Sequence, residues 1–182
     1  MHQKTWPILA GIVIIVAALS VRTLHVRAQG WRRISPHEDV SATIDGATLT
    51  IEYGRPSMLG RQIFGWLVPY DVVWCPGADE ATILESTHVL EIGSLRVPTG
   101  PHTIWILPTP EQFTFIVSKE RSGFHTFYRS RSDLGRVEMR KRQLPSAVDQ
   151  LTFAIDRSPG GGGIISMAWE KTEVSVPFKV VQ

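Results

Sequence analysis

The sequence predicts an all-β protein, an antiparallel β-sandwich or jelly-roll-like barrel with one long ordered loop. Two observations indicate this fold class. Apolar and polar residues alternate in short segments such as 49–53 and 151–155, which is typical of strands with one buried face. Turn signals rich in glycine and proline separate these segments at intervals of about 8–12 residues, the spacing found in sandwiches and barrels.

The first two strands are expected to form a hairpin. Residues 40–44 and 49–53 both alternate, and Asp45-Gly46 between them is a strong signal for a two-residue turn. The second strand leads directly into a long segment without alternation. That segment is therefore expected to extend from the end of a hairpin.

The remaining elements are mostly strands. Residues 103–107 are apolar on both faces, so we expect them at the centre of a sheet. Residues 121–133 are less regular and predict a second loop, and residues 145–150 predict a helical turn. Further strands are expected at residues 81–86, 89–92, 95–97, 113–117, 137–140, 151–155, 165–169 and 174–180.

We call residues 53–82 the signature loop. A loop of this length in a compact domain is uncommon and is often functional. Glycines and prolines shape it into turns, because glycine permits a positive φ and proline fixes φ. It also carries many apolar residues, which are expected to be buried and to keep the loop ordered: Ile63, Phe64, Trp66, Leu67, Val68, Tyr70, Val73 and Trp74.

Unusual residues follow one another in this loop: Arg55-Pro56, Gly60-Arg61, Ile63-Phe64-Gly65, Leu67-Val68-Pro69-Tyr70, Trp74 and residues 77–82. These runs resemble the signature of the domain of unknown function 2911 family, which comprises exported bacterial β-rich proteins without an assigned activity. The likeness continues at residues 97–100 and 169–172 and covers most of the chain after about residue 35. It implies no reaction. The chain departs from the family pattern at Cys75, Asp79 and His102, where arginine, asparagine and tyrosine are usual.

Six residues of the signature loop are the candidate ligand-binding residues: Arg55, Arg61, Tyr70, Trp74, Asp79 and Glu80. In this hypothesis, the arginines bind an anion or carboxylate of a small polar ligand, or a protein partner. The two acids orient the ligand and the aromatic residues form a wall. In the alternative interpretation, both arginines pair with the two acids and pin the loop to the sheet, and the aromatic rings belong to the core.

The sequence identifies no catalytic residues. No Gly-x-Ser-x-Gly elbow is present. A hydrolase-like enzyme with a carboxylate or histidine as general base remains the alternative function, with Glu52 or Glu170 as a distant partner for an acid of the loop. Cys75 is the single cysteine, and a buried free thiol is a commoner state for it than a nucleophile.

No metal or other cofactor is predicted. The six histidines show no close pair with the i, i+4 spacing of zinc enzymes, although strands could bring His102 and His125 together. The net charge of +2 includes three basic N-terminal residues without a nearby acid, so the rest of the chain is close to neutral. A near-neutral surface argues against general nucleic-acid binding.

The N-terminus has the pattern of a targeting segment. Lys4 precedes an apolar run at residues 6–21, and residues 26–28 offer small-residue spacing for cleavage. This pattern predicts a secretory signal peptide. Arg22 and Arg27 follow the apolar run, however, and positive charge there resists translocation, so an uncleaved membrane anchor is the alternative.

These features divide the chain into three parts. Residues 1–28 are the predicted signal peptide or anchor, residues 29–39 a lead-in linker, and residues 40–182 a single β-sandwich domain. We expect the domain outside the cytoplasm, either periplasmic or secreted, or held at the inner membrane by the N-terminal segment.

Overall fold

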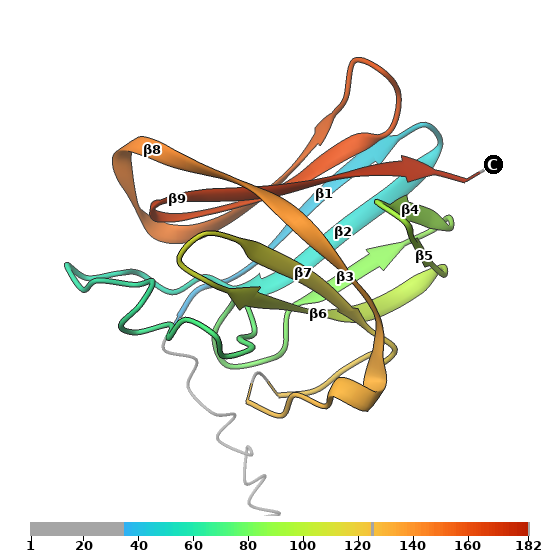
Figure 1. The fold of residues 1–182 in the computed structure, drawn as a ribbon. Helices are drawn as coiled ribbons and strands as arrows, with labels where there is room; N and C mark the ends of the chain where they lie inside the picture. The colour runs from blue at the N-terminus through green and yellow to red at the C-terminus, as the bar shows by residue number, and fades with distance from the viewer. Residues whose placement is uncertain (1–34, 125, 182) are drawn as a thin grey trace, which may run out of the picture. The chain divides into compact units, whose positions relative to one another are not determined.

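The computed structural model describes residues 35–124 and 126–181, which belong to one compact unit, Arg33–Gln182. The predicted N-terminal targeting segment and His125 lie outside the described residues. Within the described part of the chain, no helix is both long and apolar enough to cross a membrane. The elements shown in Figure 1 are β1 (His37–Ile44), β2 (Ala47–Gly54), β3 (Ile83–Ser86), β4 (Leu90–Ile92), β5 (Leu95–Val97), β6 (Gly100–Pro108), β7 (Phe113–Ser118), the 3-10 turn η1 (Ser130–Ser132), β8 (Asp133–Arg157) and β9 (Gly163–Val180).

The strands form one sheet in the order β1-β2-β3-β6-β7-β8-β9-β4-β5, and each neighbouring pair is antiparallel. The prediction of an antiparallel all-β fold is therefore confirmed. The sheet is not closed into a complete barrel, because β1 and β5 form its two edges. As predicted, the strand that is apolar on both faces is central: Ile104 and Ile106 of β6 enter the main core, whereas Trp105 packs with Cys75 in a smaller cluster.

The predicted hairpin joins β1 and β2. Asp45 and Gly46 both have positive φ, 49° and 86°, as a tight two-residue turn that matches the strand twist requires. The carboxylate of Asp45 accepts hydrogen bonds from the guanidinium of Arg157 at 2.8 Å and the backbone N–H of Gly162 at 2.6 Å. The turn is thereby attached to the connection between β8 and β9.

The long strands β8 and β9 form a bent hairpin. Gln143 of β8 pairs with Thr172 of β9, and the next pair joins Val148 to Glu170. Between these two pairs, β8 therefore has more residues than β9. Extra residues on one strand bend the ladder. The helical turn predicted at residues 145–150 is therefore wrong. These residues belong to the bulged part of β8, where a proline, which cannot donate to the ladder, is tolerated.

The bend folds the sheet into two layers with the main core between them (Figure 1). Phe153, in the second half of β8, meets Tyr53 of β2 edge to face with ring centroids 5.0 Å apart. The backbone N–H of Phe153 also donates to the Tyr53 hydroxyl at 3.2 Å, and burial raises the pKa of Tyr53. The signature loop leaves β2 on the side of the molecule where β8 and β9 bend, so residues from distant parts of the chain meet there.

Candidate functional site

The signature loop is ordered, as predicted. The N–H of Met58 donates to the carbonyl of Asp149 on β8 at 2.7 Å. Near the other end, Trp74 and Ile106 of β6 exchange two backbone hydrogen bonds of 2.8 Å each. These contacts attach the loop to both β8 and β6 and define its path across the end of the sheet.

Two glycines allow the loop to close on itself. At Gly54 an added Cβ would lie 2.1 Å from the carbonyl oxygen of Ala78, so only glycine lets the two ends of the loop meet. Gly65 has a φ of 85°, and its missing side chain leaves room for the ring of Tyr70. Tyr70 is therefore held against the turn that precedes it.

The apolar residues of the loop divide into two groups. Ile63, Phe64 and Val68 are buried in the main core. In contrast, Trp66 and Leu67 are 76% and 42% exposed, so the expectation that all apolar loop residues are buried is wrong. The N–H of Gly65 donates to the Val68 carbonyl, and the N–H of Val68 donates to the Ile63 carbonyl. These hydrogen bonds close a turn whose tip faces outward.

Arg55 joins the start of the loop to the two layers. Its guanidinium donates to the Leu151 carbonyl at 3.1 Å, the Thr152 hydroxyl at 2.9 Å and the Glu38 carboxylate at 3.0 Å. Arg55 thus pins the loop, as the alternative interpretation proposed, but its ion pair is with Glu38 of β1 rather than with either acid of the loop.

Arg61 has a local role. Its Nε donates to the carbonyl of Met58 at 2.9 Å and its Nη2 to that of Ser57 at 2.8 Å. The side chain is exposed and closes the turn formed by residues 57–61. Both hydrogen bonds are to neutral carbonyls within the loop. The predicted ion pair of Arg61 with Asp79 or Glu80 is therefore replaced by contacts within the turn.

The acids lie at the other end of the loop. Asp79 adopts a φ of 67°, in the left-handed region that aspartate tolerates better than most residues. The Glu80 carboxylate lies 3.8 Å from His37 Nδ1 in β1, and Glu80 forms an isolated bridge with Phe124. These contacts place Glu80 where the loop meets the start of β1 and Phe124.

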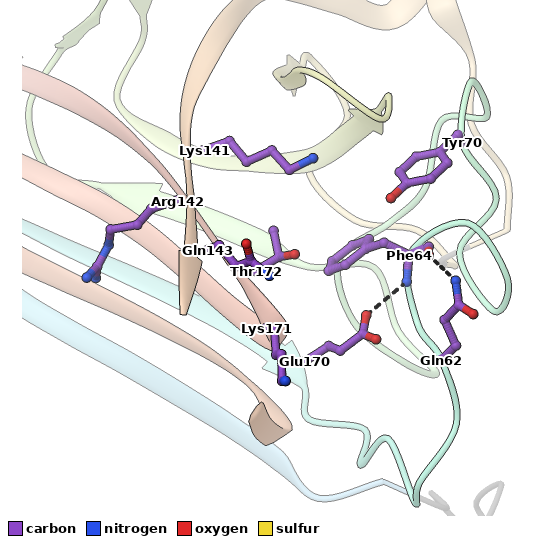
Figure 2. A pocket seen from close by; sticks show the side chains of 9 residues that line it. All are labelled: Gln62, Phe64, Tyr70, Lys141, Arg142, Gln143, Glu170, Lys171 and Thr172. Atoms are coloured by element: carbon purple, nitrogen blue, oxygen red, sulfur yellow. Dashed lines mark hydrogen bonds between the residues drawn. The ribbon is translucent and has the colours of Figure 1, made fainter. Parts of the chain in front are cut away.

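A cleft of about 380 Å³ lies between the signature loop and the bend of β8 and β9 (Figure 2). Of the six predicted ligand-binding residues, Tyr70 lines it. The other lining residues come from the turn before Tyr70, from β8 and from β9. They are Gln62, Phe64, Lys141, Arg142, Gln143, Glu170, Lys171 and Thr172.

Aromatic rings form the floor of this cleft. Phe64 packs edge to face against Phe113, Trp74 and Trp169, with centroids 5.0, 6.2 and 6.5 Å apart. Trp74 and Trp169 stack on each other at 5.9 Å. Trp74 therefore supports the floor instead of forming the predicted wall, because its face is covered by Trp169. Such a network of rings fixes the position of Phe64.

Glu170 connects the loop to β9. Its Oε2 accepts hydrogen bonds from the backbone N–H groups of Ile63 at 3.3 Å and Phe64 at 3.4 Å. Glu170 has a φ of 55°, a strained conformation for a residue with a side chain, and it lies opposite the bulge of β8. The sequence had indicated this residue twice, as a distant carboxylate and within the run 169–172.

Lys141 is one of several lining residues that the sequence did not single out, because it lies in the basic run 129–142, which is typical of a solvated strand face. Its ammonium donates to the carbonyl of Pro110 and lies 5.1 Å from the ring centroid of Phe113. Strand alternation could have identified it. Val137 and Met139 face the core, so Lys141 follows on the same side of β8.

His102 was considered as a metal ligand, and its ring is hydrogen-bonded within the protein. The ring nitrogens of buried His102 lie 2.9 Å from the Ser118 carbonyl and 3.2 Å from the Pro98 carbonyl. Whether strands bring His102 and His125 together concerns a residue outside the described part. Among residues 35–124 and 126–181, no three His, Cys, Asp or Glu side chains come together as metal ligands.

Cys75 is fully buried beneath β6. The N–H of Thr82 donates to its Sγ at 3.3 Å. Burial raises the pKa of this thiol to about 11, which keeps it protonated and weakly nucleophilic at neutral pH. The geometry therefore agrees with the expectation of a buried free thiol.

Together these features define an all-β, sandwich-like domain in which one long loop and a bent hairpin enclose a polar cleft. A family model described as protein of unknown function (DUF2911) matches residues 35–178, and the chain belongs to this family. No curated protein and no solved structure matches the chain. The resemblance seen in the signature loop is thus confirmed.

Proposed function

We propose that the protein is a binding module that takes up a small polar ligand in the cleft between the signature loop and the bend of β8 and β9. The observation that carries this proposal is the lining: polar groups of Gln62, Tyr70 and Lys141 surround an aromatic floor. Ligand sites combine an apolar wall with a few placed polar groups, in volumes of about 300–1,000 Å³. The cleft, at about 380 Å³, suits a small molecule.

The proposal revises the roles of the candidate residues. Tyr70 keeps the predicted role of a wall that faces the ligand, and Trp74 acts from behind the floor. Arg55 and Arg61 hold the loop that carries Tyr70, since their guanidinium groups are used in contacts within the protein. Asp79 and Glu80 are assigned no contact with the ligand.

We further propose that this binding takes place outside the cytoplasm. The support is the N-terminal pattern of Lys4, the apolar run 6–21 and the small residues at 26–28. A module that captures a ligand in the periplasm or at the membrane surface fits this pattern. The single thiol of the chain, Cys75, is buried and is compatible with such a location.

The binding function is tested by filling the cleft. Gln143→Trp introduces a bulky ring into the lining, whereas Arg140→Trp adds the same ring to the opposite face of β8. In a screen of small polar molecules, a ligand at about 100 times its Kd adds about 2.7 kcal/mol to stability and so raises Tm. We expect this rise in the full-length wild type and in Arg140→Trp, and its loss in Gln143→Trp.

The proposal fails if no compound raises Tm, or if Gln143→Trp responds like the wild type. A hydrolase-like activity is the second candidate, because Glu170 is the carboxylate that lines the cleft. Its Oε2 already accepts two backbone amides, which favours a structural role over that of a general base. Turnover of a bound ester or amide by the wild type would reverse this order.

A further inference from the structure

We propose that the ligand of the cleft is an anion, a small molecule whose carboxylate or phosphate oxygens bind the ammonium of Lys141. This inference rests on the binding function proposed above. It also assigns the anion to a lysine of β8 that lies outside the signature loop, in place of the arginines predicted from the sequence.

The charges of the lining support an anion. The lining contains three basic residues, Lys141, Arg142 and Lys171, and one carboxylate, that of Glu170. Arg142 points away from the cleft in Figure 2, and its Nη2 lies 2.7 Å from the Glu173 carboxylate. The charge of Arg142 is therefore balanced by a neighbouring strand residue, and Lys141 is the basic residue whose ammonium points into the space above Phe64.

Lys141 is held in place without being neutralised. The Pro110 carbonyl accepts one of its hydrogen bonds and the ring of Phe113 faces its charge at 5.1 Å. Neither group carries a negative charge, and an ammonium has three donors, so two N–H groups remain. Within residues 35–124 and 126–181, no carboxylate forms an ion pair with Lys141.

Neutral donors also line the cleft. Figure 2 shows the Tyr70 hydroxyl and the Lys141 ammonium directed into the same space above Phe64. Gln62 Nε2 donates one hydrogen to the Phe64 carbonyl at 3.1 Å and has a second one to offer. Oxygens of an anion accept hydrogen bonds from such groups more strongly than neutral oxygens do.

Glu170 determines the orientation of the ligand. Its carboxylate is fixed on the loop side of the cleft by the amides of Ile63 and Phe64. A second negative charge next to it is unfavourable, so the anionic group of the ligand is directed toward Lys141. The end of the ligand near Glu170 is then expected to be neutral or to donate a hydrogen bond.

The test compares probes that differ in charge. Glutarate and inorganic phosphate represent the carboxylate and the phosphate, and glutaramide is the uncharged match of glutarate. We expect at least one anion to bind the full-length chain in calorimetry, with NMR shifts at Gln62, Tyr70 and Gln143, and glutaramide to bind more weakly. Lys141→Gln is expected to lower the affinity about tenfold or more. Lys119→Gln, an exposed lysine after β7, is the control.

The outcomes separate the two proposals. If glutaramide binds the cleft as tightly as glutarate, the ligand is not held as an anion. If Lys141→Gln lowers anion affinity no more than Lys119→Gln does, Lys141 does not bind the anion. In both cases the cleft is still a binding site. If neither anion shifts the cleft residues, the anion inference is wrong. The binding function then stands or falls with the neutral compounds of the screen described above.

Discussion

At the scale of single residues, Arg55 and Arg61 show how one residue type serves two purposes in the same loop. Arg55 is partly buried and satisfies three groups on two other strands: a carbonyl, a hydroxyl and a carboxylate. Arg61 is exposed and bonds only to carbonyls within its own turn. The sequence treats both as candidates for binding an anion, and only their surroundings distinguish them.

This difference predicts unequal costs of truncation. Arg55→Ala leaves the Leu151 carbonyl and Glu38 without a partner and is expected to lower the free energy of unfolding by about 1–3 kcal/mol. Arg61→Ala removes exposed contacts and is expected to cost less than about 1 kcal/mol. Urea denaturation of the two variants measures both values. Equal losses would show that the loop is not pinned through Arg55.

At the scale of elements, the site depends on the contact between the signature loop and the bend of β8 and β9. The bulge on β8 places Glu170 opposite it in a left-handed conformation, and the carboxylate of Glu170 then reaches the backbone of the loop. The same bend places Lys141 on one side of the cleft and Lys171 on another. One irregularity of a hairpin thus positions residues from two strands.

Removal of this contact is predicted to loosen the loop. Glu170→Ala leaves the amides of Ile63 and Phe64 without their acceptor, and we expect faster hydrogen exchange at both, with a loss of about 1–3 kcal/mol in stability. Alanine meets the same left-handed strain as glutamate, so the change reports on the carboxylate. Glu173→Ala, on the same strand, is the control. If exchange at the two amides is unchanged, Glu170 does not hold the loop.

At the scale of the whole molecule, the outer face of the sheet is covered by a second set of contacts. Tyr128 packs on Trp105 with ring centroids 5.2 Å apart, and its hydroxyl donates to the Asp133 carboxylate at 2.8 Å. Arg136 in turn donates to that hydroxyl at 2.6 Å. Burial, followed by the hydrogen bond and charge of Asp133, raises the pKa of Tyr128 to about 12.

This shift predicts a loss of stability in alkaline solution. A group with a pKa of 10.0 when unfolded and about 12 when folded stabilises the protein below pH 10.0, and that contribution is lost as the pH rises to about 12. The difference in unfolding free energy between wild type and Tyr128→Phe should therefore shrink over this range. Denaturant titrations at several pH values measure it, and a constant difference would contradict the assignment.

Much of the fold could be predicted because strand alternation is a local property. The hairpin at Asp45-Gly46 and the central position of β6 followed from side-chain pattern and turn chemistry. The continuity of β8 did not, since a bulged strand with a proline has the local composition of a turn. The bend of β8 and β9, which escaped prediction, forms one side of the cleft.

The sequence by itself determined most of the strands, the ordered signature loop, the family and the one candidate ligand-binding residue that lines the cleft, Tyr70, because these depend on residues close together in the chain. Only the tertiary structure decided that Arg55 and Arg61 are used internally, and that Lys141 and Glu170 meet the loop. The physical reason is the bend of β8 and β9. It depends on a register shift between two strands, and that shift determines which distant side chains share one space.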